Sequence, residues 1–119
     1  MKTACTLCFH KCRIEEGKTG FCRARTNKDG VITNINYGRL TSLALDPVEK
    51  KPLKQFHPGT FILYAGSFGC NLACPFCQNS EISMADATIE TAYVPPEMLA
   101  AKAVELSKKA PGNIGIAYT

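Results

Sequence analysis

The sequence contains no tryptophan, no internal repeat, no low-complexity segment and no long hydrophobic run. Its longest apolar tract, around Phe61–Ala65, is far too short to cross a lipid bilayer. Met1–Ala4 leads directly into the first cysteine, without the apolar core of a secretory signal peptide. These absences predict a soluble cytoplasmic protein with no membrane partner.

A concentrated charge of one sign is also lacking. Fourteen Lys and Arg against ten Asp and Glu give a formal net charge of +4, and the basic residues are scattered along the chain. A nucleic-acid-binding domain is expected to gather basic and aromatic residues on one face. We therefore expect no nucleic-acid partner. The length of 119 residues, 45% of them hydrophobic, suits one modest domain core.

Cysteine is the residue that the sequence has in excess. The seven cysteines are an odd number, which fits a disulfide framework poorly, and cytoplasmic thiols stay reduced. Clustered cysteines in that setting indicate metal sites. They form two groups, Cys5, Cys8, Cys12 and Cys22 in the first and Cys70, Cys74 and Cys77 in the second. Two separate metal sites are therefore predicted.

The order of the expected elements divides the chain into two domains. Residues 1–29 have little hydrophobic periodicity and are expected to form a small cysteine-rich ribbon around a metal. Residues 30–119 are expected to begin an α/β domain. Its first elements are predicted as strands at 31–37 and 41–45, followed by a proline-containing loop at 46–53.

A strand, a helix and a second strand are predicted after that loop. Residues 60–67 form a compact apolar run typical of a buried strand, and 114–118 is expected to be a second one. Between them, 95–109 is predicted to be helical, with Met98, Leu99, Ala103 and Leu106 on one face. Such a βαβ unit closes into a parallel sheet by a right-handed crossover. Because two parallel strands leave most of a sheet uncovered, we expect more strands after Thr119 in a longer protein.

The second cysteine group follows the first of these strands directly, where parallel α/β folds place their sites. Three soft thiolates in the spacing Cys70-x3-Cys74-x2-Cys77 suit an iron–sulfur cluster or zinc. A structural zinc would need a distant fourth ligand such as His57, and such sites are usually assembled from two separated pairs. Three ligands on one loop favour a cubane cluster with one iron left open.

The first group offers four thiolates, which close a tetrahedral site. Structural zinc is the first interpretation, and a second iron–sulfur cluster or free thiols are the alternatives. His10 lies between two of these cysteines and is interpreted as a neighbour of the metal site, with direct ligation in place of Cys12 as the alternative. Asp46, Glu49, Lys50 and Lys51 are expected either at the mouth of a barrel or on an exposed charged loop.

Motifs along nearly the whole chain resemble those of a known family. The Cys-x3-Cys-x2-Cys loop, with Phe76 before its last cysteine, is similar to the cluster loop of the radical S-adenosylmethionine (SAM) superfamily. The full set narrows the resemblance to AmmeMemoRadiSam-system radical SAM proteins, which are similar to pyruvate formate-lyase activating enzyme. The set is Cys5-x2-Cys8-Phe-His-Lys-Cys12, Glu16-Gly17-x2-Gly20-x-Cys22, Tyr37-Gly38, Asp46-Pro-Val-Glu-Lys-Lys-Pro-Leu53, Phe56-x-Pro58-Gly59, Gly69-Cys-Asn, Cys77-Gln-Asn, Ile82-Ser83 and Gly115-Ile-Ala-Tyr-Thr119.

This resemblance implies a function and a cofactor set. Cys70, Cys74 and Cys77 would hold a [4Fe-4S] cluster whose open iron binds SAM, and Phe76 and Asn79 would contact the nucleoside. Reductive cleavage of SAM would give a 5′-deoxyadenosyl radical for hydrogen abstraction, as in enzymes that activate glycyl-radical proteins. An electron donor such as flavodoxin or ferredoxin, and a protein substrate, are the implied partners.

The resemblance also implies the larger fold. The α/β part would be the start of a partial (β/α)6 barrel, and the family's chain continues beyond the position of Thr119, so this portion alone is expected to be inactive. Phe9 departs from the proline that the family usually has before the histidine. Two other classes of protein remain open, a non-catalytic iron–sulfur electron carrier and a zinc-ribbon binding module.

Overall fold

The computed structural model describes residues Met1–Thr119, and its N-terminal part is a ribbon of short antiparallel strands. Strand β1 (Lys2–Ala4) pairs with β2 (Arg13–Glu15), and β3 (Arg25–Lys28) pairs with β4 (Val31–Asn34). Asn27 joins the two hairpins, because its buried amide donates to Ile14 O (2.8 Å) and accepts from Gly30 N (2.9 Å). A buried amide with both ends satisfied fixes this small unit in the absence of a large core.

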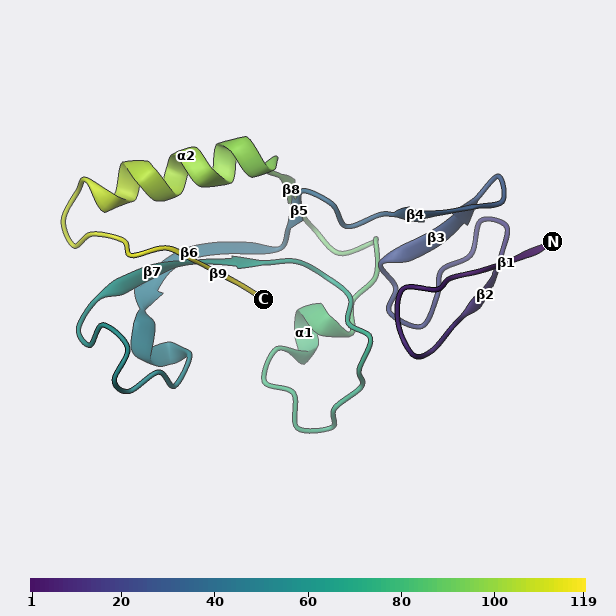
Figure 1. Cartoon of the computed structure of the whole chain (residues 1–119), viewed down its shortest axis with the longest axis horizontal. Helices are drawn as coiled ribbons and strands as arrows, with labels where there is room; N and C mark the ends of the chain where they lie inside the picture. Colours follow the sequence, from purple (N-terminus) through teal and green to yellow (C-terminus); the bar gives the residue numbers. More distant parts are fainter.

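A three-stranded sheet forms the other end of the molecule (Figure 1). Its order is β6-β7-β9, with β6 (Ser42–Pro47) antiparallel and β9 (Ile116–Tyr118) parallel to the central β7 (Phe61–Gly66). The remaining elements are the short pair β5 (Arg39–Leu40) and β8 (Ala92–Tyr93), the 3-10 turn η1 (Val48–Lys50) and the helices α1 (Ser80–Ser83) and α2 (Pro96–Ser107).

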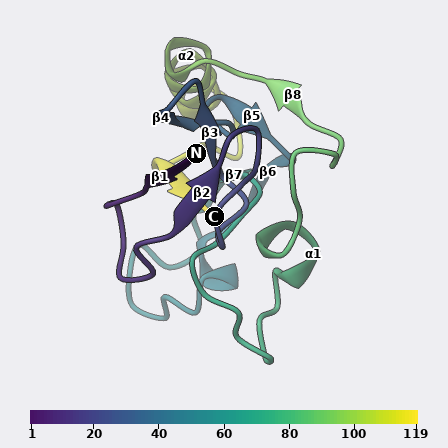
Figure 2. The same ribbon diagram turned by 90° about the vertical axis from the view of Figure 1, so that its right-hand side faces the viewer.

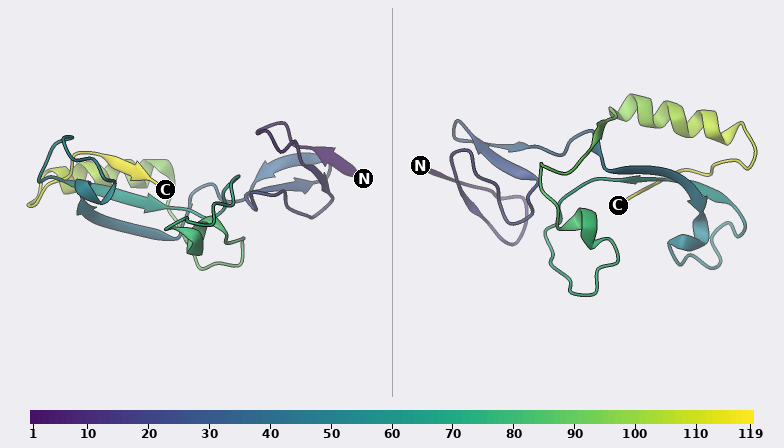
Figure 3. Two further views of the ribbon diagram at one scale, coloured as in Figure 1. Left: turned by 90° about the horizontal axis from the view of Figure 1, so that it is seen from below. Right: turned by 180° about the vertical axis from the view of Figure 1, so that it is seen from behind.

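The two helices lie on opposite sides of this sheet. Helix α2 crosses one face, whereas α1 and the loop before it lie on the other, both from the front and from behind (Figures 1 and 3). A view along the molecule from the ribbon end shows the same separation (Figure 2). The parallel strands β7 and β9, with α2 between them in sequence, form the predicted βαβ unit. The complete barrel stays a prediction.

Buried residues are few and lie in the ribbon, in β7 and in the segments that flank this strand. Only 12 of 119 residues are buried, so most of both sheet faces is covered thinly. The buried apolar residues are Cys5, Ile14, Ala24, Leu40, Val48, Ile62, Leu63, Ala65 and Phe68. The prediction of a buried strand over residues 60–67 is confirmed, because β7 has a neighbour on each edge and contributes the largest share of this core.

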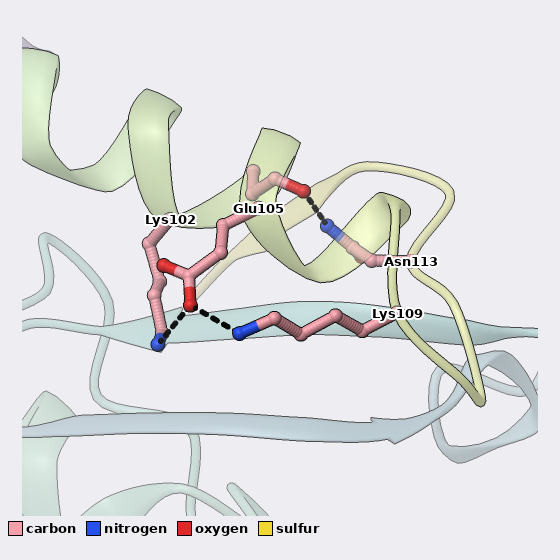
Figure 4. Close-up of polar contacts among 5 residues, drawn as sticks. Lys102, Glu105, Lys109 and Asn113 are labelled. Carbon is pink, nitrogen blue, oxygen red and sulfur yellow. Dashed lines mark hydrogen bonds and ion pairs between the residues drawn. The ribbon is translucent and has the colours of Figure 1, made fainter.

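Asn113 attaches the end of α2 to the central strand. Its amide donates to Ala103 O (3.1 Å) in the helix, and its carbonyl oxygen accepts from Leu63 N (2.9 Å) in β7. Close by, Glu105 accepts from Lys109 (2.9 Å) and pairs with Lys102 (3.6 Å) on the helix surface (Figure 4). The predicted helix is confirmed, but Met98 is exposed, so the inner face consists of Leu99, Ala103 and Leu106.

Three local predictions were wrong in extent or burial. Strand β4 ends at Asn34 instead of residue 37, because the Asn34 side chain accepts from Asn36 N and turns the chain. Asp46 and Pro47 belong to β6 instead of a loop; Pro47 is tolerated because β6 is an edge strand. Strand β9 is not buried, since β7 is its one neighbour and Tyr118 stays 60% exposed.

The predicted boundary between residues 29 and 30 falls inside the β3–β4 hairpin, whose turn lies at Asp29–Gly30. The division of the chain into a ribbon and an α/β domain stays a prediction. The outer dimensions, 53 × 31 × 23 Å, describe an elongated molecule with the ribbon at one end.

Candidate metal centre

The first cysteine group lies on turns of the ribbon. Cys5 N donates to Cys12 O (2.8 Å), and Lys11 N donates to Cys8 O (3.2 Å), which closes the turn between Cys8 and Cys12. Cys5 is buried and the other three are half-buried. Cys5, Cys8 and Cys12 therefore lie on one short segment whose conformation these two backbone hydrogen bonds restrict.

Two of these thiols accept backbone hydrogen bonds. Phe21 N lies 3.5 Å from Cys12 Sγ, and Ala24 N lies 3.4 Å from Cys22 Sγ. These hydrogen bonds orient the two sulfur atoms relative to the segment 21–24.

All four cysteines of the first group border one cavity of about 290 Å³. His10 and, from the second group, Cys70 line the same cavity. The His10 ring stacks on Phe21, with ring centroids 4.0 Å apart, and its Nε2 lies 2.8 Å from Asn71 O. His10 thus lies beside the cysteines, between the ribbon and the second cysteine group, and its role beside a metal stays a prediction.

The second group lies on the loop that follows β7. Leu72 N donates to Cys70 Sγ (3.4 Å), Cys77 N donates to Cys74 O (3.2 Å), and Cys77 Sγ lies 3.5 Å from Ser83 Oγ. All three thiols are half-buried. The loop leaves the sheet beside the end of β9, because Ser67 N donates to Thr119 O (2.9 Å).

The root of this loop is held firmly before the first cysteine is reached. Phe68 is fully buried, its carbonyl accepts from the Asn36 amide (2.8 Å), and the Arg39 guanidinium lies 4.8 Å from its ring centroid. Ser67 donates its hydroxyl to Arg39 O (2.9 Å). These contacts come from the connection between ribbon and sheet, so the position of Cys70 depends on both parts.

Ribbon and loop meet directly at Cys22 and Cys70. Cys70 N donates to Cys22 O (3.1 Å), and Gly69 lies against the same carbonyl. Arg23 adds a further link, donating to Ser83 O (3.0 Å) at the end of α1. Sequence reasoning missed Arg23 as a linking residue, because its partner lies 60 residues away and a single arginine carries no pattern.

No three His, Cys, Asp or Glu side chains converge into a group that could hold a metal ion in this structure. All seven cysteines are free thiols. The backbone therefore places the two sets of donors beside each other, while the sulfur atoms of neither set are drawn together. A metal bound at either set would have to draw the sulfur atoms closer together, so that binding would be coupled to local rearrangement.

The other predicted site residues are spread over two regions. Phe76 is 86% exposed at the tip of the loop, and Asn79 is half-buried just before α1. His57 is exposed, contacts Phe56 edge-on and does not line the cavity that the first cysteine group borders. Asp46, Lys50 and Lys51 line a hollow on the sheet together with Asn79, whereas Glu49 is not among its lining residues.

Comparison with known proteins finds similarity to an archaeal protein. A protein of Methanocaldococcus jannaschii named "Uncharacterized protein MJ0808" is 46% identical over 82 residues, which are 69% of this chain. The aligned part is 25% of that protein, so the chain spans about a quarter of its length. No protein-family model and no solved structure matches the chain. The structure contains no helix that is both long and apolar enough to cross a membrane.

Proposed function

We propose that this chain is the N-terminal portion of a radical SAM enzyme of the activating-enzyme-like type. The observation that supports the proposal best is the position of the Cys70-x3-Cys74-x2-Cys77 loop. It follows the carboxyl end of the central strand β7, and the parallel strand β9 ends beside it. Ligand sites of parallel α/β folds lie at this edge.

The donor set of the loop fits a [4Fe-4S] cluster. Three half-buried thiols lie within eight residues, none is used in a disulfide, and Leu72 N donates to the Cys70 sulfur. Cys70, Cys74 and Cys77 would hold the cluster, and the chemistry that it supplies when bound is the one-electron reduction of SAM. Three protein ligands leave one iron for a substrate or cosubstrate.

Residues next to the loop would hold this site in place and shield it. Phe68, Arg39 and Asn36 fix the start of the loop, which limits the movement of Cys70 relative to the sheet. The exposed ring of Phe76 is free to stack on a nucleoside base, and the Asn79 amide can bind polar atoms of that nucleoside. These two are binding residues in the proposal, and no residue of this chain is assigned a catalytic proton transfer.

The first group would hold zinc or a second iron–sulfur cluster and give the ribbon its rigidity. The Cys22–Cys70 and His10–Asn71 contacts would then restrict the movement of the cluster-loop backbone. We further propose a cytoplasmic location, an electron donor such as flavodoxin or ferredoxin, and a protein or small-molecule substrate. The remaining part of a (β/α)6 barrel, with most of the SAM pocket, would lie in the longer protein.

The proposal is tested by anaerobic reconstitution of the chain with iron and sulfide. A brown protein with a [4Fe-4S] electron paramagnetic resonance signal after dithionite reduction is expected. Cys74→Ser should lose the signal and Cys12→Ser, the matched control in the ribbon, should keep it. A colourless protein that binds zinc at both cysteine groups would instead indicate a zinc-ribbon binding module.

Binding of SAM separates an enzyme from an electron carrier. In a protein extended by the downstream coding sequence, saturating SAM should change the signal of the reduced cluster, because a ligand on one iron alters the electronic structure of the whole cluster. The 119-residue chain should show a weak change or none, since affinity depends on a complete, preorganised pocket. An intact reduced cluster in the extended protein that ignores SAM would contradict the proposal.

A further inference from the structure

A hollow of about 400 Å³ lies on the sheet face that carries α1, opposite α2. Its walls come from β6, β7, the turn η1 and the segment that follows the second cysteine group. Lys51, Tyr64 and Thr119 line it on the sheet side and Gln78 and Asn79 on the loop side. The hollow is therefore continuous with the loop that carries Cys77, and a molecule bound there would lie next to that loop.

Lys51 is held across the sheet rather than projecting into solvent. Its ammonium lies 5.2 Å from the Tyr64 ring centroid and 2.5 Å from Thr119 Oγ1, immediately after β9. The turn that carries it is anchored, because Val48 is fully buried and its N–H donates to Thr60 O (3.0 Å). Lys51 N in turn donates to Val48 O (3.1 Å). A lysine tied down at both ends loses little further freedom when it binds a ligand.

Among the side chains that line the hollow, two lysines face one carboxylate. Lys50 forms an ion pair with Asp46 (3.2 Å), the one acidic side chain that lines the hollow. The other carboxylate at the hollow is the chain terminus at Thr119. Lys51 forms no ion pair with any Asp or Glu side chain. Partial burial, followed by the Asp46 carboxylate, raises the pKa of the Tyr64 phenol, so Tyr64 stays neutral at physiological pH and does not supply the missing anion.

We propose that Lys51 binds an oxyanion, a carboxylate or phosphate group, of the substrate that enters this hollow. Half-buried Lys51 provides the charge, and the neutral amides of Gln78 and Asn79 and the hydroxyl of Thr119 provide hydrogen-bond partners for the rest of an acidic molecule. The oxyanion site stands on the geometry of the hollow alone. Only the description of its ligand as a substrate rests on the proposed function.

Lysine acylation read by mass spectrometry tests the site in the wild-type chain. Sodium acetate or inorganic phosphate is titrated at constant ionic strength, and the rate of N-acetylation is followed at each lysine. Because the amine reacts only while it is free of its oxyanion, Lys51 should be protected about 10-fold at a ligand concentration about ten times the dissociation constant. Lys54, an exposed lysine three residues away that does not line the hollow, is the matched control and should change less than about twofold under the same conditions. Equal effects on both lysines would overturn the proposal.

Two additions identify the source of the oxyanion and separate this inference from the proposed function. Asp46→Asn, which frees Lys50, should strengthen protection by acetate, whereas no change would contradict the charge argument. SAM that protects Lys51 at a concentration at least tenfold lower than acetate needs would assign the lysine to the SAM carboxylate and overturn the substrate assignment. Acylation needs no cluster, so failure of cluster assembly or of the SAM response would leave the oxyanion result standing.

Discussion

Gly69 is the residue on which the junction between ribbon and cluster loop depends most directly. Its φ of +88° lies in the left-handed region, and a Cβ atom there would lie 2.5 Å from Cys22 O and 3.1 Å from the Ala24 Cβ. Because Cys22 O also accepts the hydrogen bond from Cys70 N, it cannot move aside without breaking that bond. A side chain at position 69 is therefore excluded by both backbone conformation and space.

Gly69→Ala should destabilise the protein more than Gly59→Ala. Gly59 also has a positive φ, +78°, but a Cβ atom at this position would have no neighbour within 4 Å, so it isolates the backbone cost. We expect a loss of about 1–2 kcal/mol for Gly59→Ala and a further loss of about 1–3 kcal/mol from overpacking for Gly69→Ala. Urea denaturation followed by circular dichroism measures both, and equal losses would show that the junction adapts.

At the scale of residues, the sequence indicated how the cysteines are grouped but not how the groups touch. The first group lies on turns of the ribbon and the second on the loop after β7. The contact between the two groups could not be predicted, because the hydrogen bond from Cys70 N to Cys22 O joins positions 48 residues apart. It also uses backbone atoms that every residue has. The same holds for Lys51, whose partners Tyr64 and Thr119 lie on two separate strand segments.

The α2–β9 crossover shows how single side chains hold elements that share little buried surface. Asn113 forms hydrogen bonds to both α2 and β7, and the ion pairs of Glu105 with Lys102 and Lys109 are exposed at the end of the helix (Figure 4). The Lys109 hydrogen bond first, and then the charge of Lys102, lower the pKa of the Glu105 carboxyl. This helix end is therefore sensitive to acid and to salt.

The pKa of Glu105 should respond to Lys109 and not to Lys108. A carboxyl with a lowered pKa in the folded state stabilises that state above its unfolded pKa, and the contribution is lost as the pH falls through the folded pKa. Titration of the Glu105 carboxyl carbon by nuclear magnetic resonance should give a value below that of an ordinary glutamate. Lys109→Gln should raise it, and Lys108→Gln, next to it but outside the ion pairs, should leave it unchanged. A value insensitive to Lys109 would refute this cause.

Elements with strong local signals were predicted well, and elements defined by neighbours were not. Strand β7 is recognisable from its own apolar run, and the start of α2 is recognisable from Pro96. Strand β9 has an equally apolar sequence, yet Ile116 is 40% exposed, because burial depends on what lies beyond its free edge. The two-residue pair β5–β8 joins segments more than 50 residues apart and has no periodic pattern to detect.

At the scale of the whole molecule, the ribbon and the sheet meet along a narrow junction. The radius of gyration is 16.7 Å, whereas a compact domain of this length would have one of roughly 13–14 Å. The extra length comes from the ribbon, which extends away from the sheet (Figure 3). Each unit keeps its own cysteines, although Cys70 also borders the cavity of the ribbon.

Metal analysis of cysteine variants tests whether the two sets act separately. Cys70→Ala, Cys74→Ala and Cys77→Ala should each lose nearly all iron of the cluster and leave the metal of the first group bound, whereas Cys8→Ala should lose the latter. Inductively coupled plasma mass spectrometry of reconstituted variants gives both contents. Zinc falling in parallel with iron in the Cys70, Cys74 and Cys77 variants would mean that the seven cysteines form one shared site, with the common cavity as its centre.

The central place of β7 has a consequence for the timescale on which the cluster loop can move. Its amides are paired on both edges, and Leu63 and Ala65 are almost fully shielded from solvent, so this strand opens last when the protein fluctuates locally. Fraying of β9 or of the ribbon hairpins can occur many times before β7 exchanges its amide hydrogens. The loop that carries Cys70 therefore starts from the slowest-exchanging part of the chain. Its first cysteine keeps its position while β9 and the ribbon hairpins open and close.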